Sequence, residues 1–318
     1  MQALRLAAER QGPLITPDML AGDDGANING PSLVMMPAWA KGRLGLYHLY
    51  FAHHHGSYIR LAYSDALQGP WRVHLGGVLS LAECPFLMDH IASPDVHVDE
   101  QNRRIIMYFH GPEQNGHEQT TFAAVSVDGL SFRPDPRKLG PFYARIFRHD
   151  GWWYGLFGTG NIRLCRSRDG LSGFEEGPVM LPGSRRFRPR HVAVRKNGDA
   201  LTVFYTRTGD APERILHGSV DISKEWWLWS VRGKRELLRP ETGYEGADLP
   251  VRRGRVGVAK GRENALRDPA IFEQDGRTWL LYAFAGESGI ALAELRSERT
   301  RYERIRKSFA ALWSRTAA

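Results

Sequence analysis

Several aspartate, arginine and histidine residues stand beside short apolar segments of this chain, where they could take part in acid–base chemistry. Asp268 follows Arg267 and precedes a proline in "RDPAIF", and Asp95 follows a proline in "SPDVHV". A carboxyl group can accept or release a proton while a bond is cleaved. Because these side chains are seldom fully buried without partners, bringing them together would create a paired network, a ligand site or both.

Similar polar residues recur along the chain, either at the start of an apolar segment or at the end of an aromatic-rich one. The first group comprises Asn29, Asp95, Arg145, Arg190, His191, Arg267 and Asp268. The second group comprises His55, His110, Glu113 and Glu287. Whether these residues form one site depends on the elements that position them.

The positions recur because the chain repeats one unit five times. The units begin near residues 29, 93, 140, 188 and 267, each with a short apolar strand, a polar turn such as Asn-Gly or Asp-Gly, an aromatic-rich strand and a third strand. Such strands and turns are typical of antiparallel hairpins. Four strands per unit, repeated five times, predict an all-β protein with a five-bladed β-propeller fold. A β-sandwich is the alternative, but its strands would not normally repeat one four-part motif.

The fifth unit lacks an outer strand, so we expect another part of the chain to complete it. Either part of residues 1–28 or the final segment can do so. Aromatic and aliphatic residues at helical spacing predict an amphipathic helix over residues 297–314, packed on the propeller. Residues 1–318 would then form a single domain.

The propeller geometry brings the candidate residues together. In an antiparallel blade the start of the first strand and the end of the second lie on the same face. Since the inner strands line the central channel, the polar residues at these positions should converge at one mouth of the channel. The sequence therefore predicts one polar site on the propeller axis.

Composition limits the classes of partner. The formal net charge is +8, yet no basic run interleaved with aromatic residues matches a nucleic-acid-binding pattern, so we expect no nucleic-acid partner. No stretch of about eighteen uncharged apolar residues and no signal-peptide pattern is present, which predicts a soluble, cytoplasmic protein without a membrane partner. Cys84 and Cys165 are far apart and predict neither a disulfide framework nor a zinc cage.

The proline-led "SPDV" and "RDPAIF" segments, and "YSDALQGPW" after a third strand, resemble the five-bladed propeller glycosidases of glycoside hydrolase families 43, 32 and 117. The resemblance spans about residues 29–295. It implies cleavage of a glycosidic bond by carboxyl groups at the channel mouth. In the family 43 pattern an aspartate opens the first blade as general base, but this chain has "NGPS" there. Asparagine cannot take a proton from water at neutral pH.

The resemblance leaves the catalytic roles to other residues. We expect Asp268 or Asp95 to act as base, and nearby arginines would lower their pKa values, which suits a base. A general acid is also required. Glu245, in the long connection between the fourth and fifth units, is the first candidate because long loops often bind substrates. A histidine of the rim, such as His55 or His110, is the alternative.

No cofactor is expected, although the "HHH" triplet makes a divalent metal ion bound in the channel an alternative. If the triplet is a strand, His53 and His55 share one face, and His110 or His191 would supply the third ligand. The substrate would be a small or terminal sugar unit, and the arginines leave an anionic sugar open. A phosphorylase, a sugar lyase and a non-catalytic sugar-binding propeller are the alternative functions, and the oligomeric state is open.

Overall fold

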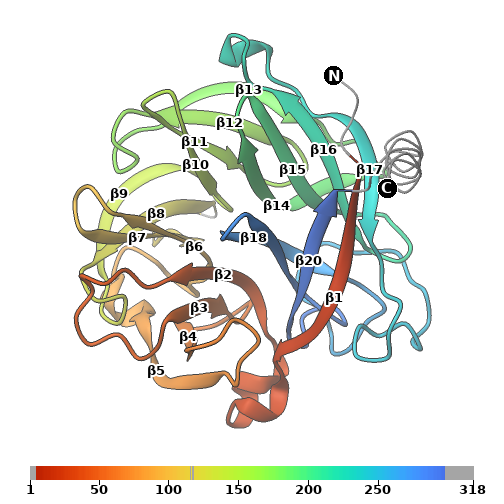
Figure 1. Ribbon diagram of the computed structural model, residues 1–318, viewed down its shortest axis with the longest axis horizontal. Helices are drawn as coiled ribbons and strands as arrows, with labels where there is room; N and C mark the ends of the chain where they lie inside the picture. Colours follow the sequence, from red (N-terminus) through yellow and green to blue (C-terminus); the bar gives the residue numbers. More distant parts are fainter. Residues whose placement is uncertain (1–4, 115, 117, 298–318) are drawn as a thin grey trace, which may run out of the picture.

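The computed structural model of the protein describes residues 5–114, 116 and 118–297. Within these residues, twenty strands form five four-stranded antiparallel sheets around a central axis (Figure 1). Each sheet is one blade, and the all-β, five-bladed propeller predicted from the sequence is confirmed. The predicted C-terminal helix lies outside the described residues, except for its first position.

Each blade is a meander whose first strand lies next to the first strands of neighbouring blades. Blade 1 contains β2 (Asn29–Met35), β3 (Tyr47–Ala52), β4 (Tyr58–Ser64) and β5 (Arg72–Ser80). Blade 2 contains β6 (Ala92–Asp99), β7 (Arg104–Pro112), β8 (Gln119–Ser126) and β9 (Arg133–Pro141). Blade 3 contains β10 (Arg145–His149), β11 (Trp152–Phe157), β12 (Ile162–Ser167) and β13 (Glu175–Leu181). Blade 4 contains β14 (Arg188–Asn197), β15 (Ala200–Thr208), β16 (Ile215–Asp221) and β17 (Arg232–Leu238).

Blade 5 contains β18 (Arg267–Gln274), β19 (Arg277–Ala283), β20 (Ile290–Ser297) and β1 (Leu6–Ile15). Strand β1 is the outer strand, which pairs antiparallel with β20 from Leu6 opposite Ser297 to Ile15 opposite Ile290. In Figure 1 the red β1 lies beside the blue β20, so the N-terminal segment closes the ring. Short 3₁₀ helices at Pro17–Met19, Gly22–Ala26, Leu81–Glu83 and Trp226–Leu228 lie in the connections.

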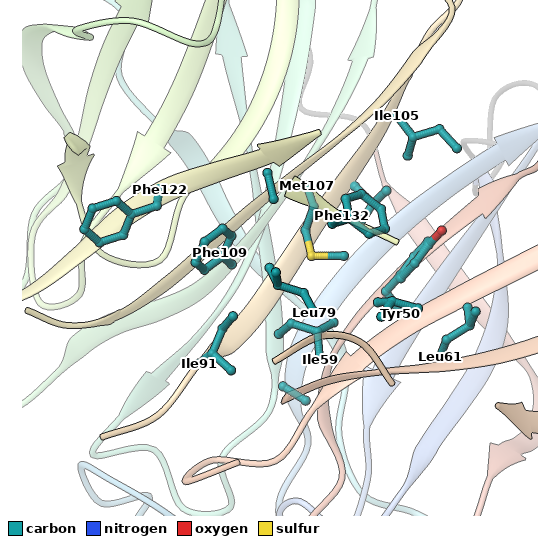
Figure 2. Close-up of a cluster of buried hydrophobic side chains, with 14 of the residues drawn as sticks. Tyr50, Ile59, Leu61, Leu79, Ile91, Ile105, Met107, Phe109, Phe122 and Phe132 are labelled. Atoms are coloured by element: carbon teal, nitrogen blue, oxygen red, sulfur yellow. The ribbon is translucent and has the colours of Figure 1, made fainter. Parts of the chain in front are cut away.

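The apolar core lies mainly between neighbouring blades. Figure 2 shows one cluster, in which Tyr50 and Leu61 of blade 1 pack near Met107 and Phe109 of blade 2. Full burial of such a side chain contributes about 1.5–3 kcal/mol. The apolar faces of the strands therefore hold the blades together and leave the polar strand starts for the axis.

A left-handed residue marks the start of each inner strand, and register shifts accompany it in β2, β6, β14 and β18. At the equivalent position of the five blades, Gly30, Ser93, Tyr143, His191 and Asp268 have φ values of 58°, 52°, 66°, 51° and 46°. Non-glycine residues rarely adopt this left-handed conformation, and where they do they concentrate at functional sites. This conformation interrupts the normal strand alternation, and the residue there has a side chain in every blade except blade 1. Four of these five residues line one pocket.

Two expectations concern features outside the site. Cys84 and Cys165 are both buried free cysteines. No helix among the described residues has the length and apolarity needed to cross a membrane.

Candidate active site

A pocket of about 200 Å³ opens on the axis where the inner strands begin, and we call it the axial pocket. All five blades and the connection before β18 contribute to it. Its titratable lining residues are His54, His90, Tyr143, His110, Arg188, Arg190, His191, Asp268 and Glu287. The convergence predicted from the propeller geometry therefore brings six of the predicted residues, Asn29, His110, Arg190, His191, Asp268 and Glu287, into one place.

Asp268 is the carboxylate with a free oxygen in this pocket. It is only 3% exposed. The hydroxyl of Tyr143 donates a hydrogen bond to Asp268 Oδ1, whereas Oδ2 is buried and has no hydrogen-bond partner among the residues that the structure describes. A buried carboxylate oxygen without a partner is costly unless a ligand or water occupies the adjacent space.

The surroundings of Asp268 raise its pKa. Burial is the main cause, the negative charge of Glu287 adds to it, and together they raise the pKa of Asp268 to about 6 despite the hydrogen bond from Tyr143. A carboxylate with this pKa is mostly ionised at pH 7 and is a stronger base than an exposed aspartate. These properties suit general-base catalysis near neutral pH.

Glu287 has a different environment, although it lines the same pocket. Arg267 donates to Oε1 at 3.0 Å and Asn27 donates to Oε2 at 2.5 Å. His54 Nδ1 lies 3.5 Å from Oε1. Burial would raise the pKa of Glu287, but the contact with His54 and the charge of Arg267 hold it well below its ordinary value. Glu287 is therefore an ionised group that cannot act as a general acid.

The predicted arginines pair with buried glutamates beneath the pocket. Arg190 donates to both carboxylate oxygens of Glu213, at 2.9 and 2.6 Å. Arg267 contacts Glu213 at 3.2 Å as well as Glu287. Glu213 is fully buried, so this network replaces the water that the charges lose on folding. The positive charges of Arg190 and Arg267 are therefore paired with glutamates and are not free to bind an anionic ligand.

Histidines form much of the remaining wall. Burial, together with the charges of Arg190 and Arg267, lowers the pKa of His191 well below its ordinary value. His191 is therefore neutral, and its Nδ1, 3.6 Å from Asp268 Oδ1, makes a polar contact and not an ion pair. Burial likewise lowers the pKa of His110. Neither residue is in its protonated imidazolium form at neutral pH.

Asp95 and Arg145 lie in a second cavity, which we call the channel cavity. It is lined by residues of all five inner strands, among them Asp95, His97 and Arg145. Asp95 Oδ2 accepts hydrogen bonds from His97 Nε2 at 2.9 Å and from the Ile146 backbone at 2.8 Å. The Arg145 guanidinium stacks on the Tyr143 ring, 4.9 Å from its centroid. Neither Asp95 nor Arg145 lines the axial pocket.

Glu245 and Glu113 lie away from both cavities. Glu245 is fully buried, and its carboxylate accepts hydrogen bonds from Arg10 at 2.9 Å, from Tyr282 at 2.8 Å and from two backbone amides of its own loop. It ties the closing strand β1 to the loop before β18. Glu113 lies in a shallow groove beside Lys138 and Thr120. A general acid must reach the substrate, so neither glutamate is retained for that role.

The histidine triplet is a turn and not a strand, because β3 ends at Ala52. Strand alternation therefore does not apply to it. His54 points into the axial pocket lining, whereas His55 is exposed and lies beside His90 and Asp89. Among the described residues, His55 does not meet His110 or His191 in a group that could hold a metal.

Three residues of the site were not in the predicted set. Tyr143 occupies the bulge position of blade 3, and a search for the residue equivalent to Asp268 in each unit would have found it. His54 follows the end of the second strand of blade 1, which is one of the repeat positions where polar residues were expected. His90 lies in the connection between blades 1 and 2, and no repeat position identifies it.

Gly30 occupies the corresponding position of blade 1, where the family 43 pattern would have an aspartate. A Cβ atom there would lie 3.1 Å from Ser93 Cα, so a side chain would be crowded against blade 2. The bulge position that carries a carboxylate in this propeller is in blade 5.

These features define a five-bladed propeller with one polar axial pocket, and solved structures share its fold. One is a GH43 β-xylosidase/α-arabinofuranosidase from a compost microbial metagenome, in complex with xylotriose, with a TM-score of 0.60 and 14% identity; the match covers 92% of this chain and 96% of that one. Another is a GH43_1 enzyme from Xanthomonas citri, with a TM-score of 0.62 and 12% identity, covering 93% and 92%. The predicted resemblance to the propeller glycosidases is thus confirmed in the fold, at low identity.

A curated relative is much more similar in sequence. Uncharacterized protein R118 of Acanthamoeba polyphaga mimivirus is 37% identical over 303 residues, which cover 86% of this chain and 85% of the relative. The chain belongs to the same family as this viral protein. No protein-family model matches the sequence.

Proposed function

We propose that the protein is a glycoside hydrolase that cleaves a glycosidic bond in the axial pocket with Asp268 as general base. The observation that carries the proposal is the buried Asp268 carboxylate, which has one oxygen held by Tyr143 and the other without a partner among the described residues. The fold shared with GH43 enzymes supports the same class of reaction.

In this proposal Asp268 Oδ2 takes a proton from a water molecule while the oxygen of that water attacks the anomeric carbon. Tyr143 prevents rotation of the carboxylate, and the pKa of about 6 keeps it ionised yet basic at pH 7. Surrounding burial excludes competing water. Asp95 takes no part, because its Oδ2 is occupied by two hydrogen bonds in the channel cavity.

His54 is the proposed general acid, which protonates the leaving oxygen as the glycosidic bond breaks. It lines the pocket, and its Nδ1 faces the ionised Glu287 at 3.5 Å. The Asn27 side chain accepts from the His54 backbone at 2.9 Å and donates to Glu287, so it aligns the pair. Histidine is the side chain that normally exchanges a proton between pH 5 and 8.

A small or terminal sugar suits the size of the pocket, which holds one ring more readily than a chain. Thr159, Thr208 and Gln119 supply polar groups for hydroxyls, and Phe142 supplies an aromatic face. Since Arg190 and Arg267 are paired, an anionic group on the sugar would meet Arg188, which is exposed at the pocket. We therefore propose a carbohydrate partner recognised mainly through its hydroxyls.

The test is a screen of aryl glycosides and oligosaccharides with the wild-type chain and Asp268→Asn. We expect turnover of one substrate by the wild type, a loss in kcat of about 10³-fold in Asp268→Asn and an almost unchanged affinity for the product sugar. Equal turnover in both proteins would exclude Asp268 as the base.

A non-catalytic sugar-binding propeller is the second candidate, favoured by Gly30 at the position where family 43 has its base. The same screen distinguishes it. In that case, calorimetry would detect sugar binding by both proteins, and neither would release product.

A further inference from the structure

A group of metal-binding side chains lies beside the axial pocket, and the proposed hydrolysis assigns no role to any of these three residues. His55 belongs to the turn between β3 and β4, and Asp89 and His90 belong to the connection between β5 and β6. His55 and Asp89 are exposed, whereas His90 is 6% exposed and lines the axial pocket. The group of three residues therefore extends from the protein surface to the wall of the axial pocket.

The spacing of the ligand atoms is compatible with one ion. One nitrogen or oxygen atom from each residue lies within 4.8 Å of the other two. Asp89 Oδ2 and His90 Nδ1 are 3.2 Å apart. Two ligands of a tetrahedral zinc ion with bonds of 2.0–2.1 Å are about 3.3 Å apart, so small side-chain rotations complete the set.

Backbone hydrogen bonds fix the two loops relative to each other. The Ile91 amide donates to Gly56 O at 3.0 Å, directly beside His90 and His55. The Met88 amide donates to Pro112 O at 2.9 Å, which anchors the second loop to β7. The His55 amide donates to His53 Nδ1 at 3.1 Å, which holds the turn that presents His55. Binding therefore needs little ordering of the chain.

We propose that His55, Asp89 and His90 bind a divalent transition-metal ion of the zinc type at the rim of the axial pocket. Two imidazoles and one carboxylate favour zinc, cobalt or nickel, whereas calcium and magnesium prefer oxygen ligands throughout. Three protein ligands leave a coordination position open to water or to an oxygen atom of a bound molecule.

The test uses the full chain without a histidine tag, freed of metal with a chelator and titrated with Zn²⁺ by calorimetry. We expect one equivalent of Zn²⁺ per chain and no comparable binding of Ca²⁺. His55→Ala and Asp89→Asn should each weaken Zn²⁺ binding by at least tenfold. Both side chains are exposed, so these variants should fold, which far-ultraviolet circular dichroism without metal checks.

His74→Ala is the matched control, because it removes a histidine from β5 of the same blade, away from the cluster. Its Zn²⁺ affinity should equal that of the wild type. Co²⁺ gives a second readout: its visible absorption bands should appear on binding and disappear in the two site variants. Zn²⁺ affinity unchanged in either site variant, or no stoichiometric binding by the wild type, would overturn the proposal. No sugar is present, so the result is independent of the proposed hydrolysis.

Discussion

The axial pocket and the channel cavity lie on one axis, and each contains an aspartate and a histidine. In the axial pocket Asp268 keeps an oxygen without a partner, and His54 faces Glu287. In the channel cavity Asp95 and His97 bind each other at 2.9 Å. The same residue types thus leave a carboxylate oxygen without a described partner in one cavity and form a mutually satisfied pair in the other.

The difference comes from the position of the aspartate relative to proline and to the bulge. Asp268 precedes Pro269 and occupies the left-handed bulge position, whereas Asp95 follows Pro94 and lies two residues beyond the bulge residue Ser93. The left-handed residue interrupts strand alternation. A carboxylate at that residue therefore lines the axial pocket, whereas a carboxylate two residues later lines the channel cavity. The carboxylate that stays on the regular strand meets backbone and side-chain donors in the channel.

Exchanging each aspartate for asparagine tests the comparison most strongly. Asp268→Asn should lower kcat about 10³-fold, because asparagine cannot accept the proton. Asp95→Asn should change kcat less than about threefold, since this residue does not reach the axial pocket. Steady-state kinetics on the substrate found in the screen measures both effects. If Asp95→Asn were the more damaging variant, the roles of the two cavities would be reversed.

The two histidines give the next contrast. His54→Gln should lower kcat about 10²-fold, because glutamine cannot protonate the leaving oxygen. His97→Gln should leave the rate unchanged. Steady-state kinetics of each variant provides the measurement. A flat response to His54→Gln would remove it from the mechanism.

Stability should respond to the same aspartates with opposite sign. The folded pKa of Asp268 is about 6, above the ordinary 3.8, so its contribution to stability is present below pH 3.8 and is lost as the pH rises through 6. Asp268→Asn should therefore stabilise the protein at pH 7 by up to about 3 kcal/mol, relative to its effect at pH 4.

For Asp95, burial is outweighed by His97 and Arg145, and its pKa is lowered. Its contribution is therefore present above pH 3.8 and is lost as the pH falls through the folded value. Asp95→Asn should destabilise the protein at pH 7. Urea unfolding at pH 7, with pH 4 as the reference for Asp268→Asn, measures these effects, and a stabilising effect of Asp95→Asn at pH 7 would contradict the distinction between the cavities.

Tyr143→Phe should have the smallest effect. The hydroxyl lowers the pKa of Asp268, so its removal should move the acidic limb of kcat/KM upward by about one pH unit. Phenylalanine keeps the ring contacts with His110, His191 and Arg145, which limits structural changes. An acidic limb that stays in place would mean that Asp268 does not control it.

Much of the fold could be predicted because its determinants are local. Hairpin turns such as Asp150-Gly151, Asn197-Gly198 and Asp275-Gly276 recur between strands of alternating character, and each connects the first two strands of its blade. The repeat then identified the strand starts, and with them Asp268 and His191. Glu245 as general acid and Asp95 as base were predictions that depended on which cavity each side chain lines. No local sequence pattern encodes that.

The sequence by itself determined the five repeated units, the all-β class and the end of the propeller where polar residues gather, because hairpin chemistry and strand alternation act over a few neighbouring residues. Only the tertiary structure decided which carboxylate of the two cavities keeps an oxygen without a partner among the described residues and has a raised pKa. That outcome depends on contacts between distant residues: Tyr143 meets Asp268 across 125 positions, and Asn27 meets Glu287 across 260. Desolvation and hydrogen bonding set the pKa of a carboxylate, and both exist only after the blades have packed around the axis.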